Sequence, residues 1–535
     1  MRTEQSQSSC NEGKKEMDNS VGSSNETSRR KFLKEVSITS ALALAGGRAF
    51  AGHSSELQSS NQSEQASAVQ NRAESKRFVA IQIGARSFVD EGVDKCLDTL
   101  QEKASVNVLM PTVFTYGRGL AGRQIPGLPL PDHGVQAYDE IHGGSYTRIH
   151  PEFYANSVIR DVRAPELGDF DILGDVTPKA KARSMKVYCL FEEAYNPSLM
   201  PNFEKVAEVD LYGKISRSTC FNNPNARNFL TSLVQDWFTN NDLDGMMWES
   251  ERQGPLNMAL KADFSSGARR SICCFCTHCL QRGHEQGINV ERARTGYVEL
   301  DRWVAQVTTQ PLPSDGSFVT LWRLLLKYPE ILAWENLWFH SQEEMYGLLY
   351  GTVKEVNPRA QVGWHIMHLV TMSPFYQADQ NYARLAHVSD YIKPSPYNNC
   401  AGPRLAQYVK NVQSTIFRDF TPDEVLELHY KILHLEGEPG LEKLPTAGLS
   451  ANYVGRETER ALADVHGAVP IYPGIDIDIP TALNEKRTQP SDVKAAVLAA
   501  FKAGAPGVVL SRKYAEMRLT NLAGAGEALR ELNGR

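Results

Sequence analysis

The sequence lacks three features, each of which would assign it to a well-known class of protein. Beyond the N-terminal 51 residues, no apolar run approaches the roughly 20 residues that a membrane-spanning helix requires. No basic block stands out beyond the N-terminus and the formal net charge is −6, so the composition gives no support for nucleic-acid binding. No glycine-rich loop follows the first predicted strand, which disfavours a dinucleotide-binding fold. What remains is a 535-residue chain that is long enough to bury a large core.

The N-terminal residues contain the three parts of an export signal in order. The pair Arg29 and Arg30 precedes Phe-Leu-Lys, residues 36–45 are mildly apolar, and residues 49–51 (Ala-Phe-Ala) fit a small-x-small cleavage site. This pattern predicts a twin-arginine signal peptide at residues 1–51; the alternative is a solvated basic patch before a core helix. We therefore expect a periplasmic or secreted protein that engages the twin-arginine export machinery and keeps no stable membrane anchor after cleavage. Residues 52–76 are rich in Ser, Gln, Asn and Glu, and we expect them to be a disordered linker to a folded domain at residues 77–535.

From residue 78 onward, apolar strands alternate with amphipathic helices. Eight strands are predicted, at residues 78–83, 106–110, 186–191, 243–248, 361–365, 390–393, 469–475 and 507–511. A helix is predicted from Pro224, with Asn223 as its N-cap, and another at residues 491–503 that stops at Gly504. Eight successive strand–helix units favour an α/β fold, a closed parallel (β/α)8 TIM barrel, over an open doubly wound sheet.

The predicted barrel carries three long insertions. They span about residues 117–165, 252–320 and 400–450, and they follow the second, fourth and sixth strands. All three are therefore expected at the C-terminal mouth of the barrel, which is where barrels of this type place their chemistry.

Carboxylates and aromatic side chains gather at the predicted strand ends. Aromatic faces offer apolar area to the C–H faces of sugars, and carboxylates bind hydroxyls and supply acid and base, so this mixture predicts a carbohydrate substrate. The expected substrate contacts are Trp248, Trp364, His365, Lys393, Tyr397 and Arg512. Each has an alternative: tryptophan can be barrel packing, His365 with His368 can bind a metal or be satisfied histidines, and Lys393 can form a Schiff base or an ion pair.

Catalysis by a carboxylate pair requires one acid at each side of the sugar, and strands four and seven can supply them across the mouth. On the fourth strand Glu249 and Glu251 share a face in extended chain. We expect Glu251, which is further out and whose charge the adjacent Arg252 can steady, to be the acid/base, with Glu249 as second choice or as a substrate contact. On the seventh strand we expect Asp478 to be the nucleophile or base, with Asp476 as second choice. The alternative for any one of these carboxylates is a helix cap or an ion-pair partner.

The cysteines form the sharpest local pattern. Residues 273–279 (Cys-Cys-Phe-Cys-Thr-His-Cys) hold four thiols in seven positions, and such short spacing suits a tetrahedral zinc site. Disulfides and free thiols are the alternatives, although near-adjacent thiols pair poorly with one another. A protein that folds in a reducing cytoplasm before export can take up the metal first. The predicted cofactor is thus a structural zinc ion, and no organic cofactor is expected.

The run Cys274-x-Cys276-x-x-Cys279, a short way after the acidic end of the fourth strand, resembles the family 42 glycoside hydrolases. The wider chain is also similar to uncharacterised exported glycosyl-hydrolase-like barrels. The resemblance implies a β-galactosidase-type barrel with catalytic carboxylates on strands four and seven, and a zinc ion that one upstream cysteine helps to bind. Cys220 lies about where that upstream ligand is expected, so the implied ligands are Cys220, Cys274, Cys276 and Cys279, with Cys273 in reserve.

Together these patterns predict a glycoside hydrolase that cleaves O-glycosidic bonds of oligo- or polysaccharides. Two alternatives use the same barrel. One is a metal-dependent sugar isomerase, epimerase or lyase, because histidines and carboxylates at the mouth can bind a divalent cation. The other is a carbohydrate-binding barrel without catalytic activity.

Overall fold

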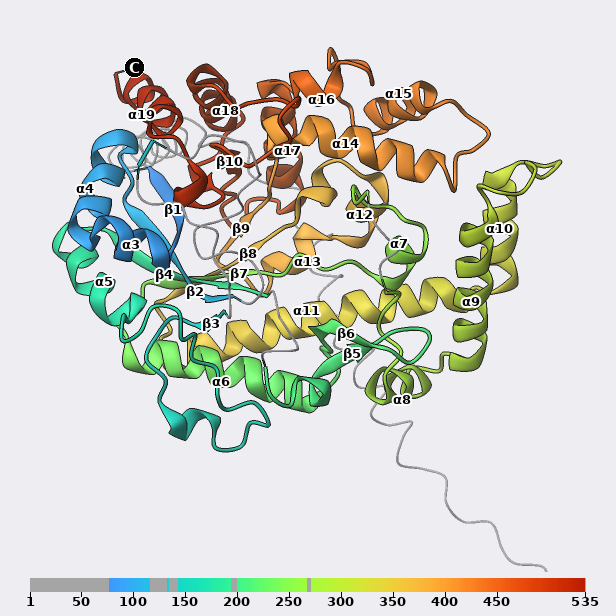
Figure 1. Cartoon of the computed structure of the whole chain (residues 1–535), viewed down its shortest axis with the longest axis horizontal. Coiled ribbons are helices and arrows are strands. Elements are labelled where there is room, and N and C mark those ends of the chain that lie inside the picture. The colour runs from blue at the N-terminus through green and yellow to red at the C-terminus, as the bar shows by residue number, and fades with distance from the viewer. Residues whose placement is uncertain (1–76, 116–131, 134–142, 194–199, 267–270, 535) are drawn as a thin grey trace, which may run out of the picture. The chain divides into compact units, whose positions relative to one another are not determined.

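The computed structural model describes residues 77–115, 132–133, 143–193, 200–266 and 271–534, and from Arg77 onward the chain forms one compact unit (Figure 1). The predicted signal peptide (1–51) and linker (52–76) lie outside the described residues, as do residues 117–131 and 134–142 of the first predicted insertion. Among the helices of the described part, none combines the length and the apolar character that crossing a membrane would require.

Eight parallel strands form the barrel, which confirms the predicted TIM-barrel fold. In order around the sheet they are β10 (Gly474–Asp476), β11 (Gly507–Ser511), β1 (Phe78–Gly84), β2 (Val108–Thr115), β4 (Lys186–Glu192), β7 (Gly245–Glu249), β8 (Gln361–His365) and β9 (Tyr391–Lys393). A parallel bridge between Ile392 and Ile471 joins β9 to the segment before β10 and brings the two ends of the sheet together. Of the predicted strand 469–475 only residues 474 and 475 belong to β10, because Pro470 and Pro473 have no N–H to donate to a ladder.

Helices surround the strands (Figure 1). Asn223 accepts a hydrogen bond from the Asn225 amide and Pro224 is the first helical residue, which confirms the predicted start of α6. The predicted helix at 491–503 is α18, one residue earlier at each end. The helices that cover the barrel include α3 (Ala85–Glu91), α4 (Val93–Ala104), α5 (Ile172–Ala182), α6 (Pro224–Asn240), α11 (Glu330–Val356), α12 (Pro374–Asp379), α13 (Tyr382–Ala386), α17 (Ala451–Asp464), α18 (Pro490–Lys502) and α19 (Leu519–Asn533).

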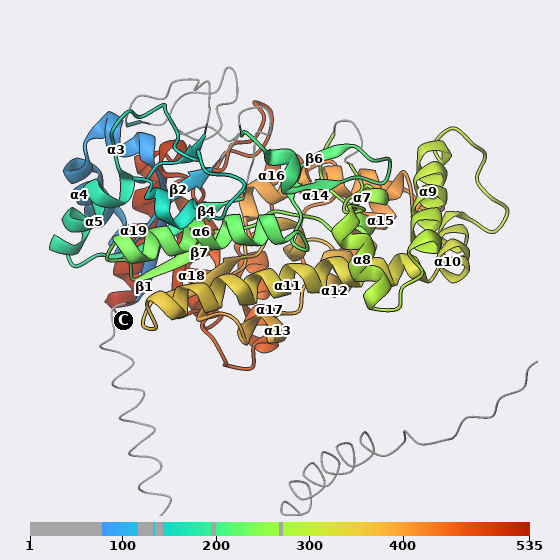
Figure 2. The same cartoon turned by 90° about the horizontal axis from the view of Figure 1, so that it is seen from below.

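The insertions are mainly helical. The one after β7 contains α7 (Pro255–Ala259), α8 (Thr277–Glu285), α9 (Val290–Gln306) and α10 (Ser317–Lys327), and the one after β9 contains α14 (Asn398–Gln413), α15 (Pro422–Ile432) and α16 (Leu444–Ala447). Short antiparallel strand pairings accompany the barrel: β3 (Gly144–Ser145) pairs with β2, and β5 (Ala207–Val209) pairs with β6 (Ile215–Thr219). Figure 2 shows α9 and α10 at one end of the molecule, away from the barrel strands.

The strands separate two apolar layers, because successive side chains point to opposite faces of a strand. The small inner cluster fills the barrel and consists of Ala80, Val108, Met110, Tyr188, Leu190, Met247, Tyr391, Tyr472 and Val509. The large outer cluster lies between strands and helices. Polar side chains that continue the inner alternation at the C-terminal ends of the strands therefore point into the mouth.

Candidate active site

A row of polar side chains lies above the inner apolar cluster. Each of six strands places one polar residue two positions beyond an inner-cluster residue: Gln82, Thr112, Glu192, Glu249, Lys393 and Ser511. The strand register pairs Glu192 with Glu249, Glu249 with His365, and His365 with Lys393, so these four are lateral neighbours. Sequence reasoning missed Gln82 and Ser511, although their alternation with Ala80 and Val509 is the signal that could have found them.

Glu249, Glu251 and His365 come together at the centre of this row. His365 Nδ1 lies 3.8 Å from Glu249 Oε2, and His365 Nε2 lies 3.6 Å from Glu251 Oε1. One ligand atom from each of the three residues lies within 4.8 Å of the other two. Glu249 is buried and accepts a hydrogen bond of 3.1 Å from Gln82 Nε2, whereas the Glu251 side chain is 33% exposed. The predicted pair on the fourth barrel strand is thus one buried and one solvent-accessible carboxylate around an imidazole.

Lys393 is fully buried beside this group. Its Nζ lies 2.8 Å from His365 Nδ1 and donates to the Tyr397 hydroxyl and, at 3.4 Å, to Ser395 Oγ. Burial lowers the pKa of Lys393 to about 7, against the opposing effect of Glu249 and Glu251. Of the two residues that we expected to contact substrate, Lys393 is therefore a partner of His365, and Tyr397 is a partner of Lys393.

The two histidines do not form a metal-binding pair. Arg404 Nη1 lies 2.8 Å from His368 Nδ1, and because arginine only donates, that nitrogen is an acceptor. Burial and, secondarily, Arg404 hold the pKa of His368 well below its usual value, so the ring is neutral with its proton on Nε2. A protonated nitrogen cannot coordinate a metal, and His368 stands apart from the group of Glu249, Glu251 and His365.

The predicted carboxylates of the seventh barrel strand have different surroundings. Asp476 is completely buried, and its two oxygens accept hydrogen bonds of 2.9 Å from the backbone amides of Cys400 and Ile479. Burial raises the pKa of Asp476 to about 6. Asp478 accepts from the backbone N, Nε and Nη2 of Arg518 at 3.0, 2.8 and 3.2 Å. Neither aspartate joins the group around His365, so the structure does not bring Asp478 together with Glu251.

Three residues that we expected to contact substrate lie outside the group around His365, namely Trp248, Trp364 and Arg512. Trp248 and Trp364 are 0% exposed and belong to the outer cluster, where their rings meet edge to face at 6.2 Å. Their neighbours Glu249 and His365 face inward, so alternation alone places both tryptophans outside the barrel and leaves them no surface for a substrate. Arg512 is buried, and its Nε lies 2.9 Å from Glu516 Oε2.

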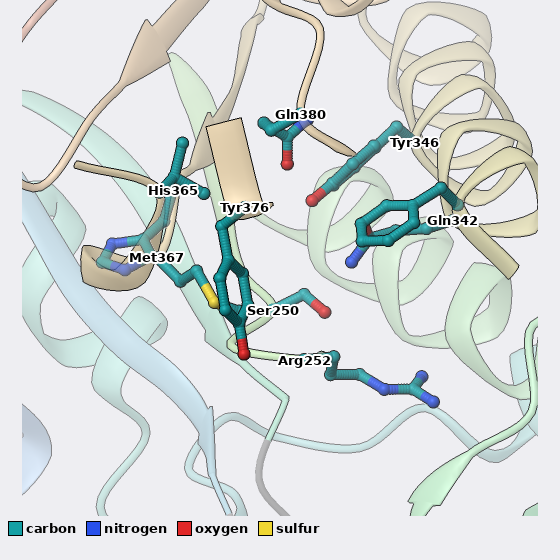
Figure 3. A pocket seen from close by; sticks show the side chains of 10 residues that line it. Ser250, Arg252, Gln342, Tyr346, His365, Met367, Tyr376 and Gln380 are labelled. Atoms are coloured by element: carbon teal, nitrogen blue, oxygen red, sulfur yellow. The ribbon is translucent and has the colours of Figure 1, made fainter. Parts of the chain in front are cut away.

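Arg252 does not steady Glu251 as expected. It forms ion pairs with Glu193 at 3.1 Å and Glu208 at 2.5 Å, and its guanidinium lies 4.0 Å from the ring centre of Phe221. Figure 3 shows the pocket beside it, with Gln342 and Tyr346 of α11 on one side and His365 and Met367 on the other. Ser250, Tyr376 and Gln380 add polar groups to the lining, and Phe339 and Val370 add apolar surface.

The structure brings the four expected zinc ligands together. Sulfur atoms of Cys220, Cys274, Cys276 and Cys279 lie within 4.8 Å of one another, and all four residues are buried. Cys220 Sγ is 3.4 Å from Cys276 Sγ and 3.5 Å from Cys279 Sγ, far longer than the roughly 2.05 Å of a disulfide. A tetrahedron with Zn–S bonds of about 2.3 Å has S–S edges of about 3.8 Å, so the arrangement fits zinc. The Cys220 thiol, followed by those of Cys274 and Cys279, holds the pKa of the Cys276 thiol below its usual value.

Comparison with known proteins gives matches of fold alone. No family model matches the chain, and no curated protein matches it. Solved structures that match include α-L-fucosidase isoenzyme 2 from Paenibacillus thiaminolyticus, at 11% identity and a TM-score of 0.44, covering 85% of this chain and 49% of that one. A β-galactosidase from the Antarctic haloarchaeon Halorubrum lacusprofundi matches at 12% identity and a TM-score of 0.48, covering 85% and 58%. A cold-adapted β-galactosidase from Rahnella sp. R3 matches at 13% identity and a TM-score of 0.47, covering 86% and 56%.

This chain therefore spans only about half to three fifths of the length of these three structures. One of the three is named as a fucosidase and two are named as β-galactosidases.

Proposed function

We propose that the protein is a glycoside hydrolase that cleaves O-glycosidic bonds of oligo- or polysaccharides, with Glu251 and Glu249 as its carboxylate pair. The observation that carries this proposal is the placement of two carboxylates on either side of His365, at the mouth of a (β/α)8 barrel. Asp476 and Asp478 are the alternatives for the second carboxylate, but both are held by donors of the protein itself. The proposed pair therefore departs from the expectation of one acid on each of two strands, because both glutamates come from the end of β7.

The exposure of the two glutamates suits different roles. Glu251 reaches solvent, so it can protonate the leaving oxygen and recover its proton afterwards. Glu249 lies deeper, where Gln82 fixes one of its oxygens, and it attacks the anomeric carbon or activates the attacking group. Lys393 donates to Nδ1 of His365, which leaves the Nε2–H of the imidazole directed at Glu251. His365 thereby orients the acid/base.

The short separation of the glutamates favours retention of configuration. Retaining enzymes hold their carboxyl groups about 5–5.5 Å apart, whereas inverting enzymes need about 6.5–9.5 Å to admit a water molecule. The nearest oxygens of Glu249 and Glu251 lie within 4.8 Å of each other. In this mechanism Glu249 forms an ester bond to the anomeric carbon as the leaving group departs with the proton of Glu251. Water then cleaves the ester with Glu251 as base.

A screen of aryl glycosides and oligosaccharides with and without EDTA tests the proposal. Sugar release that survives chelation, and a product whose first-formed anomer matches the substrate by NMR, are the expected results. The second candidate is a metal-dependent sugar isomerase, epimerase or lyase, which the grouping of Glu249, Glu251 and His365 favours because these atoms can surround a cation. EDTA-sensitive conversion without hydrolysis would support that candidate. Sugar binding without any conversion would support a non-catalytic carbohydrate-binding barrel.

We also propose that Cys220, Cys274, Cys276 and Cys279 bind a structural zinc ion. Four buried thiols can carry negative charge only beside a compensating cation, and their spacing fits a tetrahedral site without an open position. Metal analysis of the purified protein should find about one zinc per chain, as expected for a four-thiolate site. Disulfides found by mass spectrometry, together with no zinc, would refute this proposal.

Export by the twin-arginine route is a further proposal, which rests on the sequence of the first 51 residues. Replacing Arg29 and Arg30 by lysine should retain the precursor in the cytoplasm, and N-terminal sequencing of the exported protein should begin at Gly52. Normal export of the double-lysine variant would contradict it.

A further inference from the structure

A groove leads away from the carboxylate pair. Its lining includes Glu251 and Gln253, Met258 of α7, and Ile215 and Arg217 of the β5–β6 hairpin. The hairpin and α7 lie near each other in both views (Figures 1 and 2). A substrate residue whose leaving oxygen is protonated by Glu251 would therefore continue into this groove.

The hairpin that forms the wall is fastened to the rest of the protein. Asp210 Oδ1 accepts from the amides of Tyr212 and Lys214 at 2.9 and 2.8 Å, which fixes the turn. The Phe275 amide donates to the Val209 carbonyl at 2.7 Å, so the cysteine-rich segment at residues 273–279 is hydrogen-bonded to β5. These hydrogen bonds fix the backbone of the β5–β6 hairpin, and therefore the positions of its side chains relative to Glu251.

At the base of the other strand, Arg252 Nη1 donates to the Thr219 carbonyl at 2.7 Å. Arg252 itself lines the groove, but its charge is offset by Glu193 and Glu208. It therefore contributes little net attraction for a ligand.

Lys214 and Arg217 differ from Arg252. Both are exposed, both line the groove, and within the part of the chain that the structure describes neither forms an ion pair. Ser216, Ser218 and Ser271 lie among them and offer hydroxyls, while Ile215 and Met258 offer apolar surface. A lining of hydroxyls, apolar patches and two unpaired cations matches a sugar chain that carries negative groups.

We infer that this groove binds the leaving-group side of an anionic oligosaccharide, and that Lys214 and Arg217 recognise its carboxylate or sulfate groups. The inference rests on the proposed function, because it names the class of substrate for the same site. Arginine can bind a carboxylate or sulfate with two parallel hydrogen bonds, whereas lysine acts as a point charge.

Binding is measured by calorimetry on full-length mature Glu251→Gln protein, so that no probe is consumed. The probes are oligogalacturonate, which carries carboxylates, a sulfated galactan oligosaccharide, and a neutral galactan oligosaccharide of equal length. We expect at least one anionic probe to bind about tenfold more tightly than the neutral one, as two exposed charge contacts allow, with the preference falling as salt rises. The preferred probe distinguishes carboxylate from sulfate.

Adding Lys214→Ala and Arg217→Ala should abolish the preference for the anionic probe. Lys410→Ala with Lys502→Ala is the matched control, since it removes two exposed cations from α14 and α18. Equal binding of anionic and neutral probes, no binding of any probe, or a preference that survives the first double variant would overturn the inference. If no glycoside is cleaved by the wild type, yet anionic binding depends on Lys214 and Arg217, the proposed hydrolase activity fails and the groove assignment stands.

Discussion

The ends of β7 and β10 hold the same kind of residue at the same level of the barrel, but they use it differently. At the end of β7, Glu249 and Glu251 face an imidazole, and one of them reaches solvent. At the end of β10, both oxygens of Asp476 accept backbone amides, and Asp478 is paired with Arg518. A carboxylate whose oxygens are occupied by the protein's own donors holds the chain in place. Glu251, which reaches solvent and faces an imidazole, is instead suited to exchange a proton during a reaction.

The largest expected effect is on kcat, which substitutions at the end of β7 should lower far more than a substitution after β10. Glu251→Gln and Glu249→Gln should each lower kcat on a cleaved glycoside by about 100-fold or more, the usual scale for loss of an acid–base group. Asp478→Asn should leave kcat within a few-fold of the wild type, because its partner is Arg518 rather than His365. Circular dichroism of each variant checks that the fold is retained.

One pair of results would contradict this assignment of the carboxylates. If Asp478→Asn abolished turnover in a folded protein while Glu249→Gln did not, the nucleophile would lie on β10 as the sequence alone suggested. Glu192 is the next residue to test, because it neighbours Glu249 in the strand register.

The barrel could be predicted from the sequence because its signal is local and repeated. Eight apolar segments with helices between them leave few other arrangements. The observed strands match the predicted ranges to within a few residues, except where Pro470 and Pro473 remove ladder donors before β10. The four thiols could be grouped for a similar reason, since three of them lie within six positions of one another.

The side-chain partners at the mouth could not be predicted in the same way. Alternation could have excluded Trp248, because Glu249 beside it faces inward. No local pattern, however, says that Arg252 pairs with Glu193 and Glu208 rather than with its neighbour Glu251. Such pairings join residues from separate loops, and they depend on how those loops fold over the barrel.

Removing the proposed zinc ion should disturb the end of β7 and spare the end of β10. Arg252 next to Glu251 is bonded to the Thr219 carbonyl, and Thr219 immediately precedes Cys220. Cys279→Ser should therefore lose zinc, lower Tm by several degrees and reduce kcat, because the loop that positions Glu251 loosens. Cys96→Ser changes another buried thiol and should retain the metal. Full zinc content in Cys279→Ser would show that this thiol is not a ligand.

The Asp476 carboxyl at the end of β10 should make the free energy of unfolding depend on pH. Burial raises the pKa of Asp476 from 3.8 to about 6, so the folded state holds this proton more tightly than the unfolded state. The stability that the more tightly held proton of Asp476 contributes is fully present below pH 3.8 and is lost as pH rises through about 6. The free energy of unfolding of the wild type minus that of Asp476→Asn should fall by about 1.4 kcal/mol per pH unit across this window and be flat above it. A difference that rises with pH would contradict the assignment.

The smallest expected effect concerns the ion pair between Asp478 and Arg518, whose side chains are 16% and 31% exposed. Asp478→Asn and Arg518→Gln should each lower the free energy of unfolding by about 1 kcal/mol, since a partly solvated pair is worth little more. The double variant should cost less than the sum of the two, because each substitution removes the same contact. Urea titration measures all three values, and kcat should stay near that of the wild type throughout. Additive losses would mean that the two side chains are not coupled, and a loss of kcat without a loss of stability would return Asp478 to the active site.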